Sequence, residues 1–547
     1  MSIAYLRKHY KVVPTDSVFQ PLPTASRRWI LIFASMFILY LIFAPSLHIL
    51  YYSGDDFKYS FGGISKSCAE SDGYHFMLTV GRPLQTFVDC LGFKFADTLE
   101  GMRVIRIVTV MTIGMVMGLL ADWLYRLGFS LGISFFAAGN LLLIAHLYGD
   151  AVPMGAISLP LTLLLTCMGY RCVNHAHQYP VLMPASRWKA IKYLGLSFIA
   201  ILAALLTYPA LAFFFCTLML MKLLFSDLAH IKKTKQELLK ELSLFVFACI
   251  IYFIWAYYNI HYHARTEFPA AYHVGHPNLN WLEMIKRLIL LSNIFSSWWP
   301  ISPKSDSMLQ GWIMIVGLLG GIVAMIRMVY QFETTMFSNL VQGIIVGMGL
   351  FVLSSTFLLV MPTLDIVENR VLYAAVSSGL VLVFWGFWQW KNILPKEFGK
   401  TLILIGVASL FLIAGHQASH VTMVNALSHV QYLDETRVAI AHYKNTHSSL
   451  KRIHFIIPRS NSPYDRYPLA QAALVSLIKK NDFKLRWCAG SPIQAPHHVN
   501  EAVACITNRK KGDIVVTYSF EGEPFLKTDA MVMIRNHYRS LDLEYLS

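Results

Sequence analysis

An uninterrupted apolar run, WILIFASMFILYLIFAPSLHILY from Trp29 to Tyr51, is followed at once by the polar sequence Tyr52-Ser53-Gly54-Asp55-Asp56. A membrane-spanning helix needs about 20 apolar residues, so this run is long enough to cross a bilayer. It is too long for the apolar part of a cleaved signal peptide, and no small-residue cleavage site follows it. We therefore expect the first apolar segment to stay in the membrane and to place two adjacent acids at one membrane surface.

Similar apolar runs recur along the 547-residue chain, which is 56% hydrophobic and only 14% charged. Soluble domains carry about 25% charged residues, so this composition excludes a soluble multidomain enzyme. It indicates an all-α polytopic membrane protein with about eleven transmembrane helices. The expected spans lie near residues 29–51, 104–124, 129–148, 154–170, 193–207, 210–226, 243–260, 311–330, 340–362, 371–390 and 401–416.

Basic residues are concentrated in the segments that face the cytoplasm if the N-terminus is inside. Those segments hold 19 Lys and Arg against 7 Asp and Glu, while the opposite loops contain slightly more acidic than basic residues. Short cytoplasmic loops are enriched in Lys and Arg, so we expect a cytoplasmic N-terminus and an outer C-terminus. The formal net charge of +15 then follows from topology rather than from nucleic-acid binding.

This layout divides the chain into a cytoplasmic segment, residues 1–28, a transmembrane domain, residues 29–418, and an outer tail, residues 419–547. Two outer loops, 52–103 and 261–310, are far longer than connectors need to be. Long loops of this kind usually carry function.

The tail has the sequence pattern of a small α/β domain. Short β-branched runs at Ile453–Ile457 and Ile514–Tyr518 predict strands. A polar helix pattern covers Leu433–Leu450, and a further helix is expected at Ala470–Lys480 between the two runs.

The cysteines outside the expected spans occur as two pairs, one in each of two outer segments. Cys68 and Cys90 share the first outer loop, and Cys488 and Cys505 share the tail. Each pair is either a disulfide in an oxidising compartment or a pair of free thiols.

Asp55 and Asp56 are the sharpest candidates for chemistry, because they lie side by side directly after the first span. Adjacent carboxylates repel each other, so confinement raises the pKa of one of them. A carboxylate at the membrane edge can accept a proton from an attacking hydroxyl. The alternative is a solvated turn, since Gly-Asp sequences favour turns.

Two arginines in the outer segments are candidates for binding an anion. Arg82 lies in Gly81-Arg82-Pro83-Leu84, a few residues after His75, and Arg370 follows Glu368-Asn369 at the mouth of the tenth span. A guanidinium is a planar, permanently charged fork that suits a phosphate.

Ion pairing is the alternative for both arginines. Arg82 has Asp72 and Asp89 nearby in sequence, and Arg370 has Asp365 and Glu368. Arg370 is also a cation on the side of the membrane where cations are scarce, which favours a local partner such as a lipid phosphate.

Neither a metal nor a nucleotide is expected to bind. The second outer loop is rich in histidine, but no pair has the spacing of a known metal motif. No glycine-rich phosphate loop is present either, which argues against an ATP-driven pump. Any chemistry must then draw its energy from an activated substrate delivered to the outer face.

Taken together, these motifs resemble the GtrII-type glucosyltransferases, a family within the GT-C class of integral-membrane glycosyltransferases. The resemblance covers roughly the first four hundred residues and leaves the tail unaccounted for. It is carried by Tyr52-Ser53-Gly54-Asp55-Asp56, by Gly81-Arg82-Pro83-Leu84, and more weakly by Tyr208-Pro209-Ala210-Leu211 and Arg370-Val371-Leu372.

The resemblance implies inverting transfer of a sugar, glucose or another hexose, from a polyprenyl-phosphate carrier to a surface polysaccharide such as O-antigen. The reaction is expected on the outer side of a bacterial inner membrane, and an insertion at Ile64–Gly73 leaves the acceptor open. The implied residues are, as the base, Asp55 or Asp56; as contacts of the carrier phosphate, Arg82 and Arg370; and, more weakly, as substrate contacts, His75, Tyr208 and Glu368.

The partners implied are membrane lipid, the lipid-linked sugar, the glycan acceptor, a flippase and a carrier-loading glycosyltransferase, with no cofactor and no nucleic acid. The main alternative is a transporter or flippase of a lipid-linked or polar solute. Such a protein is expected to have charged or broken helices near the bilayer midplane. A non-enzymatic scaffold is a third interpretation, but it leaves the long first loop without a role.

Overall fold

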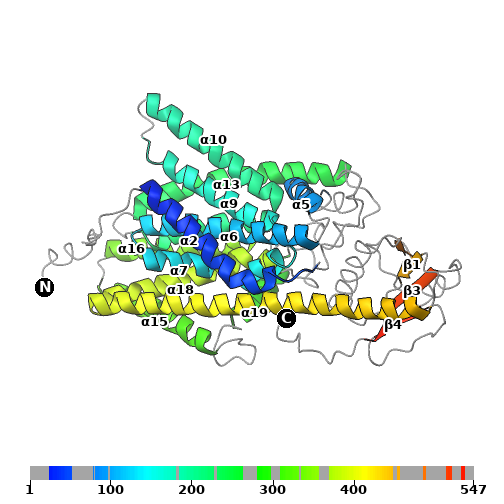
Figure 1. Ribbon diagram of the computed structural model, residues 1–547. Helices are drawn as coiled ribbons and strands as arrows, with labels where there is room; N and C mark the ends of the chain where they lie inside the picture. Colours follow the sequence, from blue (N-terminus) through cyan, green and yellow to red (C-terminus); the bar gives the residue numbers. More distant parts are fainter. Residues whose placement is uncertain are drawn as a thin grey trace.

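The computed structural model describes residues 24–51, 78, 81–95, 99–179, 184–226, 231–262, 280–296, 308–331, 334–356, 369–446, 452–455, 485–487, 513–519 and 531–535. These residues form a helical bundle followed by a small β-sheet (Figure 1). The helices used below are α2 (Thr24–Leu47), α5 (Pro83–Phe95), α6 (Leu99–Arg126), α7 (Leu131–Leu142), α8 (Ala145–Ala151), α9 (Ser158–Ala176), α10 (Pro184–Thr207), α11 (Pro209–Ala212), α12 (Phe214–Leu224), α13 (Ile231–Tyr262), α14 (Trp281–Ser296), α15 (Met308–Gln331), α16 (Thr334–Ser354), η3 (Asn369–Leu372), α18 (Tyr373–Ile393) and α19 (Lys396–Thr446).

Within the described residues, 7 helices are long and apolar enough to cross a membrane. Their apolar faces are exposed, as membrane helices require: Phe33 and Phe37 of α2 are each 62% exposed, whereas Phe43 on the same helix is fully buried. The chain is therefore an all-α polytopic membrane protein over most of its described length. The helices that qualify contain Ala25–Leu47, Leu99–Arg126, Arg187–Thr207, Lys232–Asn259, Met308–Arg327, Arg370–Ile393 and Glu397–Leu427.

The other four expected spans correspond to helices that are interrupted or that do not combine the same length and apolarity within the described residues. The span expected at 129–148 is divided between α7 and α8, because the helix breaks at Leu143 and Ile144. The span expected at 210–226 is divided between α11 and α12 at Phe213. Those expected at 154–170 and 340–362 correspond to α9 and α16. Within the part of the chain that the structure describes, length and composition alone therefore support fewer crossings than the sequence pattern predicted.

Helices α2 and α6 pack unusually closely because α6 carries Gly114 and Gly118. A Cβ atom on Gly114 would lie 2.6 Å from Cα of Met36, and one on Gly118 would lie 2.4 Å from Cα of Ile32. Glycines spaced four residues apart let two membrane helices bring their backbones together. The pairs 36/114 and 32/118 step in opposite directions, so the two helices are antiparallel with a defined register.

Helix α19 is the longest described element, with 51 residues. It includes the expected span 401–416 and continues without a break into the polar segment that was expected to form a separate helix at 433–450. The expected start of the tail at residue 419 thus falls inside one helix. Figure 1 shows this helix, in yellow, running from the far end of the bundle to the strands.

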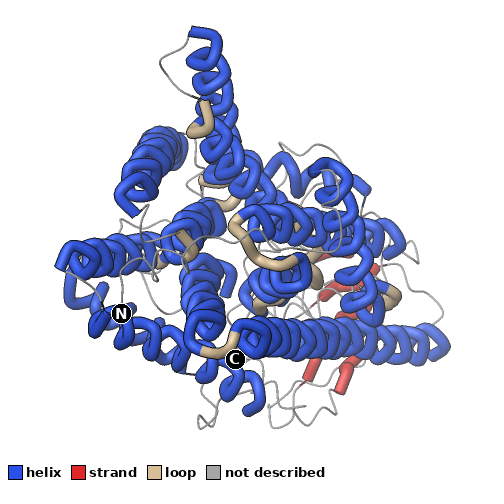
Figure 2. Tube along the Cα trace, turned by 90° about the vertical axis from the view of Figure 1, so that its left-hand side faces the viewer, coloured by secondary structure: helices blue, strands red, loops and turns tan. Residues whose placement is uncertain are grey.

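The strands form one parallel sheet with the order β2-β1-β3-β4. Ile453 of β1 pairs with Leu485 on one side and with Ile514 of β3 on the other. Both β-branched runs of the tail therefore lie in neighbouring strands, while the helix expected at 470–480 lies outside the described residues. Figure 2 shows the strands behind the helical bundle. The strands are β1 (Arg452–Phe455), β2 (Leu485–Trp487), β3 (Asp513–Ser519) and β4 (Met531–Arg535).

Candidate functional site

The Gly-Arg-Pro turn before α5 is fixed against α13. Gly81 has a φ of +77°, in the left-handed region that favours glycine, and its carbonyl accepts a 3.2 Å hydrogen bond from the Tyr252 hydroxyl. A Cβ atom on Gly81 would lie only 3.1 Å from that hydroxyl. Pro83 begins α5, a position where the missing N–H of proline leaves no hydrogen bond unmade. The turn therefore holds the backbone of Arg82 in one place at the start of a helix.

Arg82 and Arg370 meet at the ring of Tyr208. The guanidinium carbon Cζ of Arg82 lies 4.1 Å from the centroid of this ring, and Cζ of Arg370 lies 5.7 Å from the same centroid. The ring is fully buried, and Pro209 starts α11 directly after it. Three residues chosen from separate motifs are thus neighbours, and we call them the Tyr208 cluster.

The Tyr208 cluster brings two permanent positive charges together. The face of an aromatic ring attracts a guanidinium, which offsets part of the repulsion between the two arginines. The Nε atom of Arg82 is buried and has no hydrogen-bond partner within the part of the chain that the structure describes. A buried guanidinium N–H without a partner favours an anion as its missing acceptor.

Asp89, six residues after Pro83 in α5, is a buried carboxyl beside this cluster. Burial raises its pKa to about 6, and the side chains of Gln85 and Ser158 together with the charges of Arg370 and Arg82 oppose that effect. The ion pair between Arg82 and Asp89 that was one alternative does not form. Asp89 instead acts on both arginines through space, as a carboxyl that titrates close to neutral pH.

A third arginine, Arg106 of α6, was not selected from the sequence. It is 1% exposed, donates from Nε to the Pro153 carbonyl and from Nη1 to the Tyr51 carbonyl, each at 2.8 Å, and lies over the Tyr51 ring at 3.6 Å. The Tyr51 ring stacks on His429 of α19 at 5.1 Å. Arg106 thus holds Tyr51 in place, and Tyr51 is the last described residue before Asp55 and Asp56. Its sequence signal was a single arginine inside an apolar span.

Four of the candidate residues, Asp55, Asp56, His75 and Glu368, lie outside the described residues. Their roles therefore stay predictions from the sequence. Within the described residues there is no group of His, Cys, Asp and Glu side chains that could hold a metal ion.

Cys90 of α5 is disulfide-bonded. The described cysteines of the spans, Cys167, Cys172, Cys216 and Cys249, are free. The disulfide partner of Cys90 is therefore one of the remaining three cysteines of the chain, Cys68, Cys488 and Cys505. The pairing with Cys68 stays a prediction.

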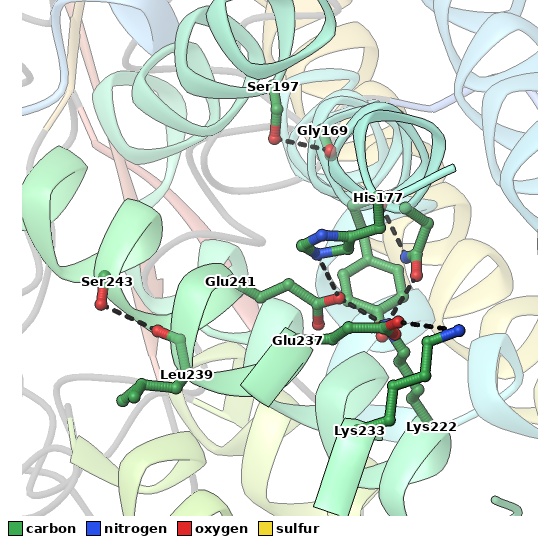
Figure 3. A network of polar contacts seen from close by, with 11 residues as sticks. Gly169, His177, Ser197, Lys222, Lys233, Glu237, Leu239, Glu241 and Ser243 are labelled. Atoms are coloured by element: carbon green, nitrogen blue, oxygen red, sulfur yellow. Dashed lines mark hydrogen bonds and ion pairs between the residues drawn. The ribbon is translucent and has the colours of Figure 1, made fainter. Parts of the chain in front are cut away.

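A second group of buried charges lies between α9, α12 and α13 (Figure 3). The Nζ atom of Lys222 is 2.6 Å from Glu241, 2.9 Å from Glu237 and 3.0 Å from the Asn174 side-chain oxygen. His177 lies 3.2 Å from the same Glu241 oxygen. We call these five residues the Lys222 network. The sequence did not single out any of its members as a site residue, because their contacts join three helices.

A scan of the sequence against known protein families finds no match, and a search of curated proteins finds no relative.

Proposed function

We propose that this protein is an inverting glycosyltransferase of the GT-C class, related to the GtrII-type glucosyltransferases. Its donor is a sugar, glucose or another hexose, on a polyprenyl-phosphate carrier, and its acceptor is a surface polysaccharide such as O-antigen. The observation that carries the proposal is the Tyr208 cluster, where two arginines from distant parts of the chain meet at one ring. Paired guanidiniums suit the charge and shape of a phosphate.

The reaction is a single displacement at the anomeric carbon. The acceptor hydroxyl oxygen forms the new bond from the face opposite the carrier, while the bond to the carrier phosphate oxygen breaks. The phosphate leaves with the electron pair, and Arg82 and Arg370 stabilise its charge. Asp55 or Asp56 takes the hydroxyl proton. His75, Tyr208 and Glu368 contact the substrates.

The disulfide at Cys90 supports the proposed orientation of the protein in the membrane. Disulfides persist in oxidising compartments, which supports an outer location for α5 and the Tyr208 cluster in the proposed bacterial inner membrane. The N-terminus is then cytoplasmic, and the C-terminus lies in the periplasm with the parallel sheet as part of a small α/β domain.

The two polar clusters support eleven crossings. Helix α12 starts six residues after Tyr208 and ends beside Lys222, so it connects the Tyr208 cluster to the Lys222 network. Helix α9 starts at Ser158, beside Asp89, and ends next to His177 of the same network. This arrangement supports a crossing by each helix, although neither is as long and apolar as the other spans. Helices α7 with α8, and α16, supply the remaining crossings.

The proposed reaction is tested with purified protein in vesicles that contain polyprenyl-phosphate glucose and a lipid-linked glycan acceptor. Wild-type protein is expected to transfer the sugar with inversion, and the variant Asp55→Asn, Asp56→Asn is expected to transfer none. Glu397→Gln, an exposed change at the other end of the bundle, is the matched control and keeps activity. Transfer by the double aspartate variant at the wild-type rate would contradict the proposal.

A transporter or flippase is the second candidate, and the Lys222 network favours it. Glu241 is fully buried within a helix that spans the membrane, and ionisable groups in that position often mark a transport path. A flip assay with a fluorescent lipid-linked sugar, without acceptor, separates the two candidates. Flipping by wild-type protein and its loss in Glu241→Gln would favour transport over transfer.

A further inference from the structure

Four arginines gather around one aspartate where α2 begins and α6 ends. Asp122, whose side chain is only 2% exposed, lies 3.1 Å from Arg27, 3.3 Å from Arg28 and 3.1 Å from Arg126. Arg171 of α9 is close enough for the charges of Arg28, Arg126 and Asp122 to act on it. We call these five residues the Asp122 cluster.

The glycine packing of α2 against α6 explains why this cluster forms. Ile32 faces Gly118, and one turn further along each helix the register brings Arg28 opposite Asp122. Arg126 follows Asp122 by one more turn of α6 and reaches the same carboxylate oxygen. The backbone contact therefore fixes the arginines before any ligand is present.

The Asp122 cluster holds more positive charge than its own carboxylate can match. Among the described residues it sets four arginines against one aspartate, and the first turn of α2 carries no acidic residue. A helix N-terminus adds further positive potential. Arg27 is buried, with its side chain 9% exposed, and its Nε has no hydrogen-bond partner in the described part of the chain. An unpartnered guanidinium N–H among surplus cations points to an anionic ligand.

Exposed aromatic side chains next to the cluster favour a lipid headgroup as the source of that anion. Trp29, directly after Arg28, is 58% exposed and stacks on Phe33, which is exposed on the lipid-facing side of α2. Tryptophan favours the headgroup level of a bilayer. The partly exposed guanidiniums of Arg28 and Arg126 thus lie where lipid headgroups lie.

We propose that the Asp122 cluster is a binding site for the headgroup phosphate of an anionic phospholipid, at the end of the bundle opposite the Cys90 disulfide. Arg28 and Arg126, whose side chains are 29% and 36% exposed, bind the phosphate, and the buried Arg27 adds its positive charge from behind them. This site is separate from the Tyr208 cluster, and it does not depend on the glycosyltransferase proposal.

The test uses the full-length protein in detergent micelles, titrated with phosphatidylglycerol, phosphatidylcholine or inorganic phosphate. Native mass spectrometry counts the bound lipids, and the Tm is measured in parallel. We expect saturable, salt-sensitive binding of phosphatidylglycerol in preference to phosphatidylcholine, and no rise in Tm with inorganic phosphate. Equal binding of both lipids, or an equal rise in Tm with inorganic phosphate, would overturn the proposal.

Matched variants locate the site. Arg28→Gln with Arg126→Gln should weaken phosphatidylglycerol binding about thirtyfold, since each basic residue near a membrane surface contributes about fivefold. Arg187→Gln with Lys192→Gln removes the same charge from exposed positions of α10 at the same end and should bind as wild type does. Equal loss in both double variants would show diffuse surface charge and overturn the site.

A single variant keeps the test valid if the double variant does not fold. Arg126 is the most exposed of the three arginines that contact Asp122, so Arg126→Gln is expected to fold. It should bind phosphatidylglycerol about fivefold more weakly. Wild-type affinity in this variant would also overturn the proposal.

Discussion

The Tyr208 cluster and the Lys222 network are both buried and polar, but their charges are matched differently. In the Lys222 network a lysine contacts two glutamates directly, at 2.6 and 2.9 Å. In the Tyr208 cluster two arginines share one ring, and the buried carboxyl beside them, Asp89, has a raised pKa. A lysine in direct contact with two glutamates holds helices together, whereas two guanidiniums at one ring are suited to an anionic ligand. Variants at the Tyr208 cluster should therefore change activity, and variants at the Lys222 network should change stability.

The largest effect is expected at the paired acids. Asp55→Asn with Asp56→Asn removes the proposed base, and a positioned base contributes about 10²–10⁴-fold to a rate. Sugar transfer measured in vesicles should fall at least that far, while membrane insertion and expression stay unchanged. Full activity in both single variants and in the double variant would remove these residues from the mechanism.

The arginines of the Tyr208 cluster should come next. Replacing Arg82 or Arg370 by Ala removes stabilisation of the leaving phosphate, and loss of one such group costs about 10²–10³-fold in kcat. Initial rates at varied concentrations of the polyprenyl donor measure this loss. Replacing either arginine by Lys keeps the positive charge but loses the planar guanidinium, so the rate should lie between those of the Ala variant and the wild-type protein. Unchanged kinetics with the donor would exclude both arginines from the site.

The Lys222 network should show the opposite pattern. Glu241→Gln leaves Lys222 with one fewer buried partner, and breaking a buried ion pair costs about 3–5 kcal/mol of stability. Thermal unfolding in detergent should show this loss, while transfer per folded molecule is kept. Lys233→Gln is the matched control: Lys233 is exposed and lies 4.0 Å from Glu237, so its removal should change stability by less than about 1 kcal/mol. Lost transfer in a folded Glu241→Gln protein would assign the network a role in function.

The smallest effect concerns Asp89 and pH. Its pKa rises from 3.8 to about 6 on folding, so the folded state holds this proton more tightly than the unfolded state does. Its contribution to stability is therefore complete below pH 3.8 and is lost as pH rises through about 6. The Tm of wild-type protein should fall across this window relative to that of Asp89→Asn. Parallel Tm curves for the two proteins would show that Asp89 does not titrate there.

Local sequence signals selected the residues of the Tyr208 cluster: Arg82 lies before Pro83, Tyr208 lies before Pro209, and Arg370 is a cation on the side of the membrane where cations are scarce. Such local signals can be read from the chain directly. The strands at Ile453 and Ile514 were visible for the same reason, since β-branched runs are local patterns.

Arg106, Lys222 and Glu241 could not be selected in this way. Their roles arise from contacts between helices that are distant in sequence, such as Arg106 with the carbonyl of Tyr51. Hydropathy shows that such a residue lies in or near a span, but it does not show which face of the helix meets which neighbour. The interruption at Leu143 and the unbroken helix α19 were missed because helix boundaries depend on the same packing.

The continuity of α19 has a mechanical consequence. A helix of 51 residues measures about 76 Å at about 1.5 Å per residue, while a bilayer with its headgroups is about 40–45 Å thick. A rigid rod of about 30 Å therefore projects beyond the lipid and ends beside the strands. The projecting part of α19 sets the distance between the sheet and the membrane surface.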